Sequence, residues 1–458
     1  MSRPAPAARR LPPSARNLLE VFANRNIASM LLLGFASGLP LALSSGTLQA
    51  WLTVRGASLQ AIGMATLIGQ AYVFKFLWAP LLDRVPIPGL APRLGRRRAW
   101  LLPLQALLAL LLGAMAWVGI PDASALPHGL AALAGVLSLS PAQARLAPVV
   151  VLAVALAFVS ASQDTVIDAY RTDLLPSEQR GAGAAVVVLG YRLGMVVSGG
   201  LALWLAAQWL GWRGMYGAMG VLMALSMLSS LWAPRPAASL PAPATLRAAV
   251  LEPAREFFSR PRASALLLAI VLYKLGDAFA GALSTTFLIR GAGYSPAEVG
   301  LVYKSMGLLS TIVGALLGGA WLARLGLWRS LLWFGIAQGL SNLAYWGLAV
   351  LPPALPLMAG AVGVENFTAG MGTAAFVAFL SALCDARFSA TQFALLSALS
   401  AVGRVYVGPL TGELVAHWGW ARFYLFSVAS ALPGVLLLWW LRPLIDAQER
   451  LHAPRGDG

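Results

Sequence analysis

The chain has 458 residues, of which 59% are hydrophobic and only 11% are charged, and its mean hydropathy is +0.74. Soluble domains carry about 25% charged residues, so this composition excludes a soluble protein and indicates an all-α polytopic membrane protein. The net charge of +16 does not indicate a nucleic-acid partner, because the arginines cluster in alternate predicted loops rather than on one face of a domain. One cysteine and three histidines, all three in predicted loops or the tail, lead us to expect no disulfide, metal site or catalytic residue in the membrane.

Twelve stretches are long and apolar enough to cross a bilayer, which takes about 20 residues each. In chain order we expect transmembrane helices at residues 27–52, 61–82, 100–120, 148–170, 182–208, 213–232, 264–288, 298–322, 328–350, 356–382, 393–415 and 422–441. The apolar run 129–139 is too short to span, and we expect a helix within a loop there. The Gly190/Gly194 and Gly314/Gly318 pairs, each four residues apart, predict close packing between helices.

Loop charge predicts the orientation of these helices. With the N-terminus inside, the inner segments hold 23 Lys and Arg, whereas the outer loops hold only five: Arg55, Arg145, Arg213, Arg290 and Arg422. Positive residues favour the cytoplasmic side, so both termini are expected in the cytoplasm.

The longest inner break divides the chain into two halves. Residues 233–263 are rich in Pro and Ala, which is typical of a linker. The linker separates a six-helix bundle over 27–232 from a second bundle over 264–441. A cytoplasmic arm over 1–26 and a tail over 442–458 complete the expected domains.

The two halves resemble each other in sequence. Val54-Arg55-Gly56-Ala57 matches Ile289-Arg290-Gly291-Ala292, and each precedes a similar stretch that leads to a glycine. Arg192 and Arg404 each follow a serine by 15 residues and an aspartate by 19. Two pseudo-symmetric six-helix bundles predict the major facilitator fold, with a binding site between the halves near the bilayer midplane.

Within the predicted spans, nine charged residues lie in stretches that are otherwise apolar. They are Lys75, Asp164, Asp168, Arg192, Lys274, Asp277, Lys304, Glu365 and Arg404. Charges are costly in lipid, so such residues face an aqueous cavity, a partner or a substrate.

The carboxylates among them are candidates for proton coupling. Asp164 and Asp168 are four residues apart and share one helix face, where mutual repulsion and burial raise proton affinity. A permanent pairing of these acids with Lys75 or Arg192 is the alternative. Asp277 and Glu365 are further candidates.

The cations and several polar residues are candidates for substrate contact. Lys274 shares a face with Asp277, so the two side chains either neutralise each other or meet substrate. Lys304 has no acid within one turn, although Glu365 on another helix is an alternative partner. Arg192 and Arg404 suit carboxylates or phosphates, or else a structural gate. The remaining candidates are Gln49, Gln70, Tyr72, Lys75, Gln163 and Tyr273.

A candidate gate follows the second predicted span. Asp83-Arg84 and then Gly95-Arg96-Arg97-Arg98 are similar to the D-R…G-R-R/K-R signature of major facilitators, in which acid and base join helix ends in one conformation. Ordinary cytoplasmic positive charge is the alternative interpretation.

Long stretches of the sequence resemble the AmpG family of anhydromuropeptide permeases, which are major facilitators. These stretches include GFASGLPLALSSGTLQAWLTV, SASQDTVIDAYRTDLLPSEQRGAGAA and VLYKLGDAFAGALSTTFLIRG. The resemblance implies a monomeric transporter in the lipid of the bacterial inner membrane. It implies import of N-acetylglucosaminyl-1,6-anhydro-N-acetylmuramyl peptides together with protons, for peptidoglycan recycling and, indirectly, β-lactamase induction. No cofactor beyond the proton gradient is expected.

Two alternatives remain open at this point. One is a major facilitator for another anionic conjugate, such as a nucleotide-linked or CoA-linked compound. The other is a polytopic membrane transferase, against which stands the lack of an intramembrane His or Cys pair and of an acidic metal cluster.

Overall fold

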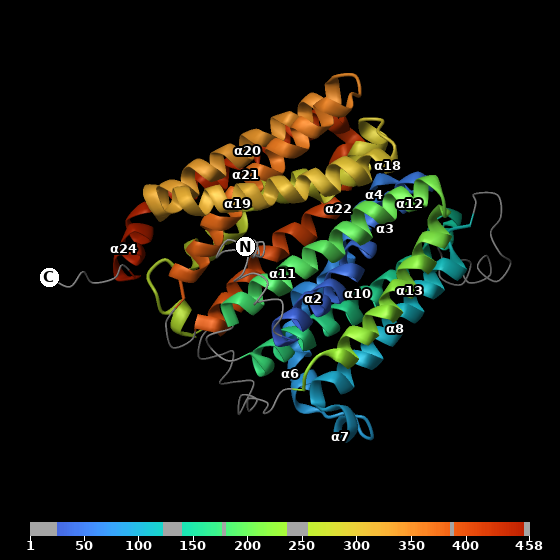
Figure 1. The fold of residues 1–458 in the computed structure, drawn as a ribbon. Helices are drawn as coiled ribbons and strands as arrows, with labels where there is room; N and C mark the ends of the chain where they lie inside the picture. Colours follow the sequence, from blue (N-terminus) through green and yellow to red (C-terminus); the bar gives the residue numbers. More distant parts are fainter. Residues whose placement is uncertain (1–24, 122–139, 176–179, 236–254, 385–388, 453–458) are drawn as a thin grey trace, which may run out of the picture.

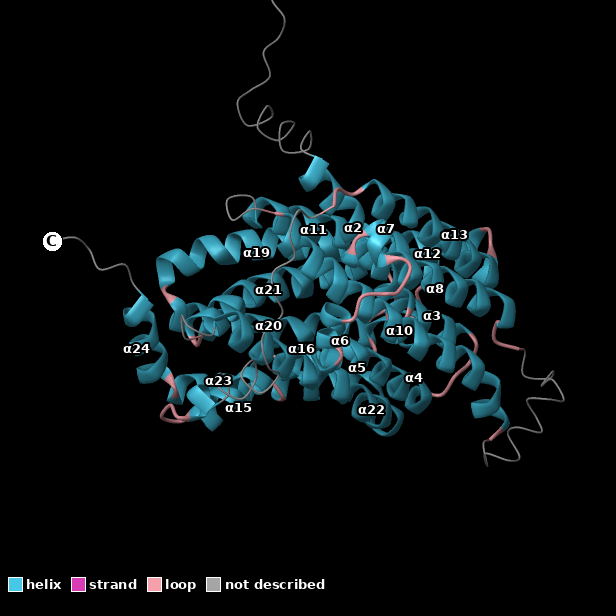
Figure 2. Cartoon of the chain, turned by 90° about the horizontal axis from the view of Figure 1, so that it is seen from below, coloured by secondary structure: helices cyan, strands magenta, loops and turns pink. Residues whose placement is uncertain are grey.

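The computed structural model describes residues 25–121, 140–175, 180–235, 255–384 and 389–452. Helices connected by short loops make up these residues, and no strand occurs among them (Figure 2). Within lipid a helix satisfies its own backbone hydrogen bonds, which is why such an apolar chain adopts this form. The expected arm up to residue 24, most of the linker and the run 129–139 lie outside the described residues.

The first half begins with a broken helix, because α2 and α3 are separated at Ser44 and Ser45. Its second segment is also broken into short pieces, and the later segments are longer. The elements are α2 (Arg25–Leu43), α3 (Gly46–Val54), α4 (Leu59–Ala65), η1 (Thr66–Gly69), α5 (Gln70–Phe74), η2 (Lys75–Leu77), α6 (Ala79–Arg84), α7 (Ala91–Leu94), α8 (Arg96–Val118), α10 (Pro141–Leu174), α11 (Arg180–Val196), η4 (Val197–Leu201), α12 (Ala202–Gln208) and α13 (Gly211–Trp232).

The second half repeats the broken first segment. Here α15 and α16 are separated at Lys274, and α16 and α17 at Leu283. The elements are α15 (Ala263–Tyr273), α16 (Leu275–Ala282), α17 (Ser284–Thr286), η5 (Phe287–Gly291), α18 (Pro296–Glu298), η6 (Val299–Lys304), α19 (Ser305–Leu325), α20 (Leu327–Val350), α21 (Leu355–Ala382), α22 (Ser389–Ala429), α23 (Leu432–Trp440) and α24 (Arg442–His452).

Eight helical runs among the described residues are long and apolar enough to cross a membrane. One of them, Leu395–Trp440, has 46 residues. It would be about 69 Å long if straight, roughly twice the thickness of a bilayer core. The non-helical backbone of Gly419, with φ 74° and ψ 167°, divides α22 into two helices, and α23 follows after a second break at residues 430–431. The helical membrane architecture is confirmed, whereas the number twelve stays a prediction.

Glycines allow neighbouring helices to approach closely within each half. A Cβ atom at Gly34 or Gly38 of α2 would overlap the backbone of Val187 or Tyr191 of α11, and one at Gly190 would overlap Leu31. In the second half, Gly314 of α19 lies against the Phe367 carbonyl of α21 in the same way. Close packing was the function predicted for these glycine pairs, and it is confirmed.

The two halves lie side by side, the first coloured blue to green and the second yellow to red (Figure 1). A Cβ at Gly63 of α4 would lie 2.6 Å from the Gly408 carbonyl oxygen of α22. A Cβ at Gly300 of η6 would lie 2.6 Å from the Gly200 oxygen of η4. The backbones of the two halves therefore approach each other closely at both contacts.

Candidate functional site

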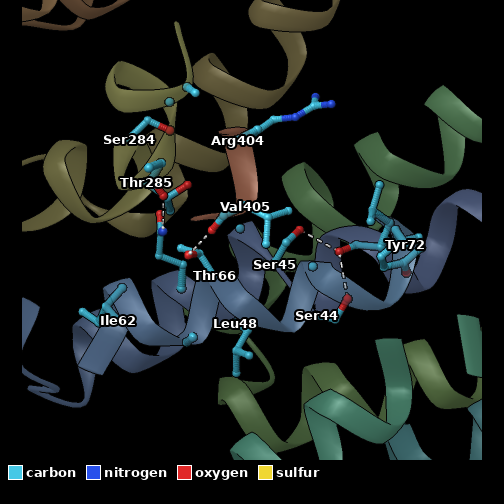
Figure 3. Close-up of a pocket in the computed structure, with 18 of the residues that line it drawn as sticks. Ser44, Ser45, Leu48, Ile62, Thr66, Tyr72, Ser284, Thr285, Arg404 and Val405 are labelled. Atoms are coloured by element: carbon cyan, nitrogen blue, oxygen red, sulfur yellow. Dashed lines mark hydrogen bonds between the residues drawn. The ribbon is translucent and has the colours of Figure 1, made fainter. Parts of the chain in front are cut away.

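A cavity of about 440 Å³ lies between the halves, and we call it the large cavity. It forms where the helices are interrupted, at the α2–α3 break and at the α16–α17 break, because such breaks release polar groups beside open space. Hydroxyl groups from both halves line it: Ser44, Ser45, Thr66, Ser284, Thr285 and Tyr303. Figure 3 shows Thr66 of the first half facing Ser284 and Thr285 of the second. This lining suits a ligand rich in hydroxyl and amide groups.

A second cavity of about 220 Å³ lies in the second half, and we call it the small cavity. Its polar lining includes Lys274, Asp277, Thr373, Ser397, Ser400 and Arg404. Its apolar lining includes Phe376, Val377, Leu380 and Phe393. Asp277, Ala278 and Arg404 line both cavities, so the two adjoin at these residues.

The charged groups at this junction differ in their partners. Lys274 Nζ lies 3.8 Å from an Asp277 oxygen and 3.4 Å from the Thr373 hydroxyl. The Arg404 side chain is exposed, and within the described part of the chain it forms no ion pair. Its guanidinium extends into the space between the two halves, away from the contact of Thr66 with the Val405 carbonyl. Arg404 therefore presents a free positive charge to a ligand.

Lys75, Asp164 and Asp168 form a charged cluster in the first half. Lys75 Nζ lies 2.8 Å from Asp164 Oδ2 and 3.7 Å from Asp168 Oδ2, and Ser37 donates a hydrogen bond to Asp164. The exposed fraction is 21% for the Asp164 side chain and 55% for that of Asp168. The structure thus brings together the pair that the sequence left as an alternative. The Lys75–Asp164 pair joins η2 to α10 in this conformation.

Other predicted site residues lie elsewhere. Gln49 and Tyr72 line the large cavity, whereas Gln70, Lys75, Gln163, Arg192 and Tyr273 line neither cavity. The buried Gln163 amide donates to the Ala36 carbonyl at 2.8 Å, and the Tyr273 ring stacks on Phe376 at 5.4 Å. Glu365, on α21, accepts a hydrogen bond from the Asn366 amide at 2.7 Å and also lines neither cavity. The side chain of Lys304 lies outside the described part. The roles of these residues stay predictions.

A hydrogen-bonded contact closes one end of the interface, and the sequence did not predict it. Gln49 donates to the Ala282 carbonyl at 2.8 Å, and the hydroxyls of Thr53 and Thr286 lie 2.9 Å apart. Arg290 donates to the carbonyls of Thr53 at 2.6 Å and Ala57 at 2.8 Å. We call this set the closed end. The repeated Val54–Ala57 and Ile289–Ala292 stretches were the available signal.

The candidate gate contains an acid that the motif did not indicate. Arg97 Nε donates to Asp173 at 2.7 Å, Arg96 lies 3.9 Å from the same oxygen, and the Asp173 side chain is 3% exposed. The side chains of Asp83 and Arg84 lie outside the described part. Asp173 is the aspartate that precedes Arg192 by 19 residues, and no role was predicted for it from the sequence. Its negative charge was the signal from which it could have been predicted as a partner of these arginines.

The sequence is similar to those of known membrane transporters. Residues 26–404 match the model of the Major Facilitator Superfamily. The chain is 56% identical over 420 residues to the "Anhydromuropeptide permease" of Escherichia coli K12, covering 92% of this chain and 80% of that protein.

Two solved structures share the fold. The nucleoside transporter NupG, as its D323A mutant, superposes with a TM-score of 0.65 at 13% identity, covering 91% of this chain and 99% of that one. A D-xylose-proton symporter gives a TM-score of 0.63 at 17% identity, over 91% and 97% of the two chains. At these identities the likeness concerns the fold alone.

Proposed function

The chain belongs to the major facilitator superfamily and, within it, to the family of anhydromuropeptide permeases, and from this membership we propose that it imports anhydromuropeptides together with protons. The cargo is an N-acetylglucosaminyl-1,6-anhydro-N-acetylmuramyl peptide, carried from periplasm to cytoplasm across the bacterial inner membrane with both chain termini inside. The transporter acts as a monomer and returns cell-wall fragments for reuse. The imported fragments also feed the induction of β-lactamase.

The identity of 56% over nearly the whole chain carries this proposal. The chemistry of the cavities supports it independently. Sugar hydroxyls and acetamido groups need many hydrogen-bonding partners, which the large cavity offers from both halves. A peptide with free carboxylates needs cations, which Lys274 and Arg404 offer beside it.

The proposed transport follows alternating access. With loop charge placing Arg290 outside, the closed end seals the periplasmic side, and cargo leaves through the opposite end. Return to the outward conformation requires the hydrogen bonds of Gln49, Thr53 and Arg290 to break while the other end closes. The Arg96/Arg97–Asp173 contact lies at that other end, where it joins α8 to α10 within the first half.

Proton coupling is assigned to Asp164. Its carboxylate neutralises Lys75 in the present conformation, and a proton arriving there would release the lysine from its partner. Inward movement of one positive charge gains about 2.3 kcal/mol per 100 mV of membrane potential, so protons can drive accumulation of anionic cargo. Asp168, Asp277 and Glu365 remain secondary candidates.

Uptake by purified protein in liposomes tests the proposal. We expect labelled anhydromuropeptide to accumulate when the outside is acidic, and accumulation to collapse with a protonophore. Unlabelled nucleotide-linked and CoA-linked compounds should not compete. Mass analysis of the internal label should show unmodified cargo, since a transferase would change it. Absence of uptake, or efficient competition by the other conjugates, would overturn the proposal.

A further inference from the structure

The two adjoining cavities differ in chemistry as well as in size. Among the described residues, hydroxyl groups and Gln49 form the polar lining of the large cavity, and its charged groups are the two that it shares with the small cavity, Asp277 and Arg404. The small cavity holds two cations, one carboxylate and three hydroxyls beside two phenylalanine rings. A ligand with a polar neutral part and a charged part would therefore place its neutral part in the large cavity and its charged part in the small cavity.

The order of residues along α22 gives the positions of the two cavities. Phe393, Ser397 and Ser400 line the small cavity, Arg404 lines both, and Val405 lines the large one. Further along the same helix, Gly412 packs against the Leu59 carbonyl near the closed end. The small cavity thus lies on the side of the large cavity that faces away from the closed end.

We propose that the large cavity binds the disaccharide and the small cavity binds the first amino acids of the attached peptide. Lys274 and Arg404 meet peptide carboxylates and Asp277 meets an amine. Ser397 and Ser400 are the specificity-determining positions, because their small side chains leave the small cavity open. This assignment rests on the proposed function and deepens it by stating where each part of the cargo lies.

The same arrangement predicts how the transporter treats peptide length. Residues beyond the small cavity would extend toward the end of the molecule that is not sealed by Gln49, Thr53 and Arg290. Longer peptides would then add few contacts, and affinity would rise between no peptide and a tripeptide but little from tripeptide to pentapeptide.

Filling the small cavity tests the assignment. Ser397→Leu should lower affinity for the anhydro-disaccharide tripeptide at least about tenfold, because an enlarged side chain there overpacks the bound complex. Affinity for the bare anhydro-disaccharide should stay within about twofold of the unmodified protein, a spread ordinary for surface changes. Ser45→Leu, which narrows the large cavity, is the matched control and should weaken both ligands.

Each outcome of these binding measurements on detergent-purified protein is decisive. Equal loss of both ligands in Ser397→Leu, with the melting temperature of the protein preserved, would overturn the assignment. If that variant does not fold, the smaller substitution Ser397→Val is used instead, and its affinities for the tripeptide conjugate and for the bare disaccharide are compared in the same way. Failure of the unmodified protein to bind either ligand would instead refute the proposed function, so the two failures are distinguishable.

Discussion

At the scale of single residues, the charges inside the membrane are not all alike. Lys75 is held by two aspartates, Lys274 is held loosely by Asp277, and Arg404 is open to the cavity. Removing one member of a buried pair leaves the other uncompensated, whereas an open cation contributes mainly when ligand arrives. The three cations should therefore respond differently to neutralisation.

Asp164→Asn should abolish proton-driven accumulation while binding of cargo falls only modestly. The amide keeps the size of the carboxylate but can neither take up a proton nor neutralise Lys75. Liposome uptake and equilibrium binding measure the two effects separately. Asp446→Asn is the control, since its exposed pair with Arg442 contributes little. Unchanged accumulation in Asp164→Asn would remove this residue from the coupling role.

Lys274→Gln should weaken binding of peptide-bearing cargo about tenfold, the equivalent of losing one hydrogen bond to a charged group. Binding of the bare disaccharide should change less, because Lys274 lines only the small cavity. Lys274→Arg keeps the charge and should restore most of the affinity. Titration calorimetry with both ligands checks this, and an equal loss for both would make Lys274 a structural residue.

At the scale of helices, small residues set how near two segments can lie. Helices in lipid gain little from the hydrophobic effect on association, so close van der Waals contact has to supply the attraction. Glycines of α2 and α11 in one half, and of α19 and α21 in the other, provide that contact. Substitution of these glycines by alanine should therefore destabilise the protein, whereas the same substitution of a glycine on an open helix face should not.

Gly34→Ala should lower the free energy of unfolding by about 1–3 kcal/mol, because the new methyl group meets the Val187 carbonyl and α2 and α11 must separate. Gly113→Ala in α8 is the matched control, since a Cβ there has nothing within 4 Å. Alanine favours helix over glycine by about 1 kcal/mol, so the control should melt at an unchanged or higher temperature. Thermal unfolding in detergent compares them, and equal melting of the two variants would contradict the packing argument.

At the scale of the whole molecule, the described residues join the two halves tightly at the closed end. The closed end combines side-chain bonds across the interface with the glycine contacts of Gly63 and Gly300 nearby. A transporter of this fold changes state by moving one half against the other. Fixing the closed end should therefore stop the cycle without damaging either half.

A disulfide between Thr53→Cys and Thr286→Cys should block uptake on oxidation, and a reductant should restore it. The two native hydroxyls are 2.9 Å apart, which places cysteines within bridging range. The native Cys384 is buried, so we expect it to form no cross-link of its own on oxidation. Each single cysteine variant, oxidised in parallel, should transport normally. Full uptake by protein that gel mobility shows to be cross-linked would argue against movement at this end.

The sequence by itself determined the helical membrane architecture and the helix-packing glycines, whereas the boundary between the halves stays a prediction. The determined features depend on local quantities: runs of apolar residues and spacing along one helix. The same reasoning identified Arg404, Lys274 and Gln49 as candidates because charged or amide groups inside apolar runs are conspicuous.

Only the tertiary structure decided which of these groups meet. Lys75 and Asp164 are 89 positions apart, and Arg97 and Asp173 are 76 apart, so helix packing alone selects the partner of each cation. The closed end depends on Arg290 reaching backbone carbonyls 233 and 237 positions away. A backbone carbonyl is present at every residue and carries no signature in sequence, and for that reason such a contact emerges only when the helices are placed in space.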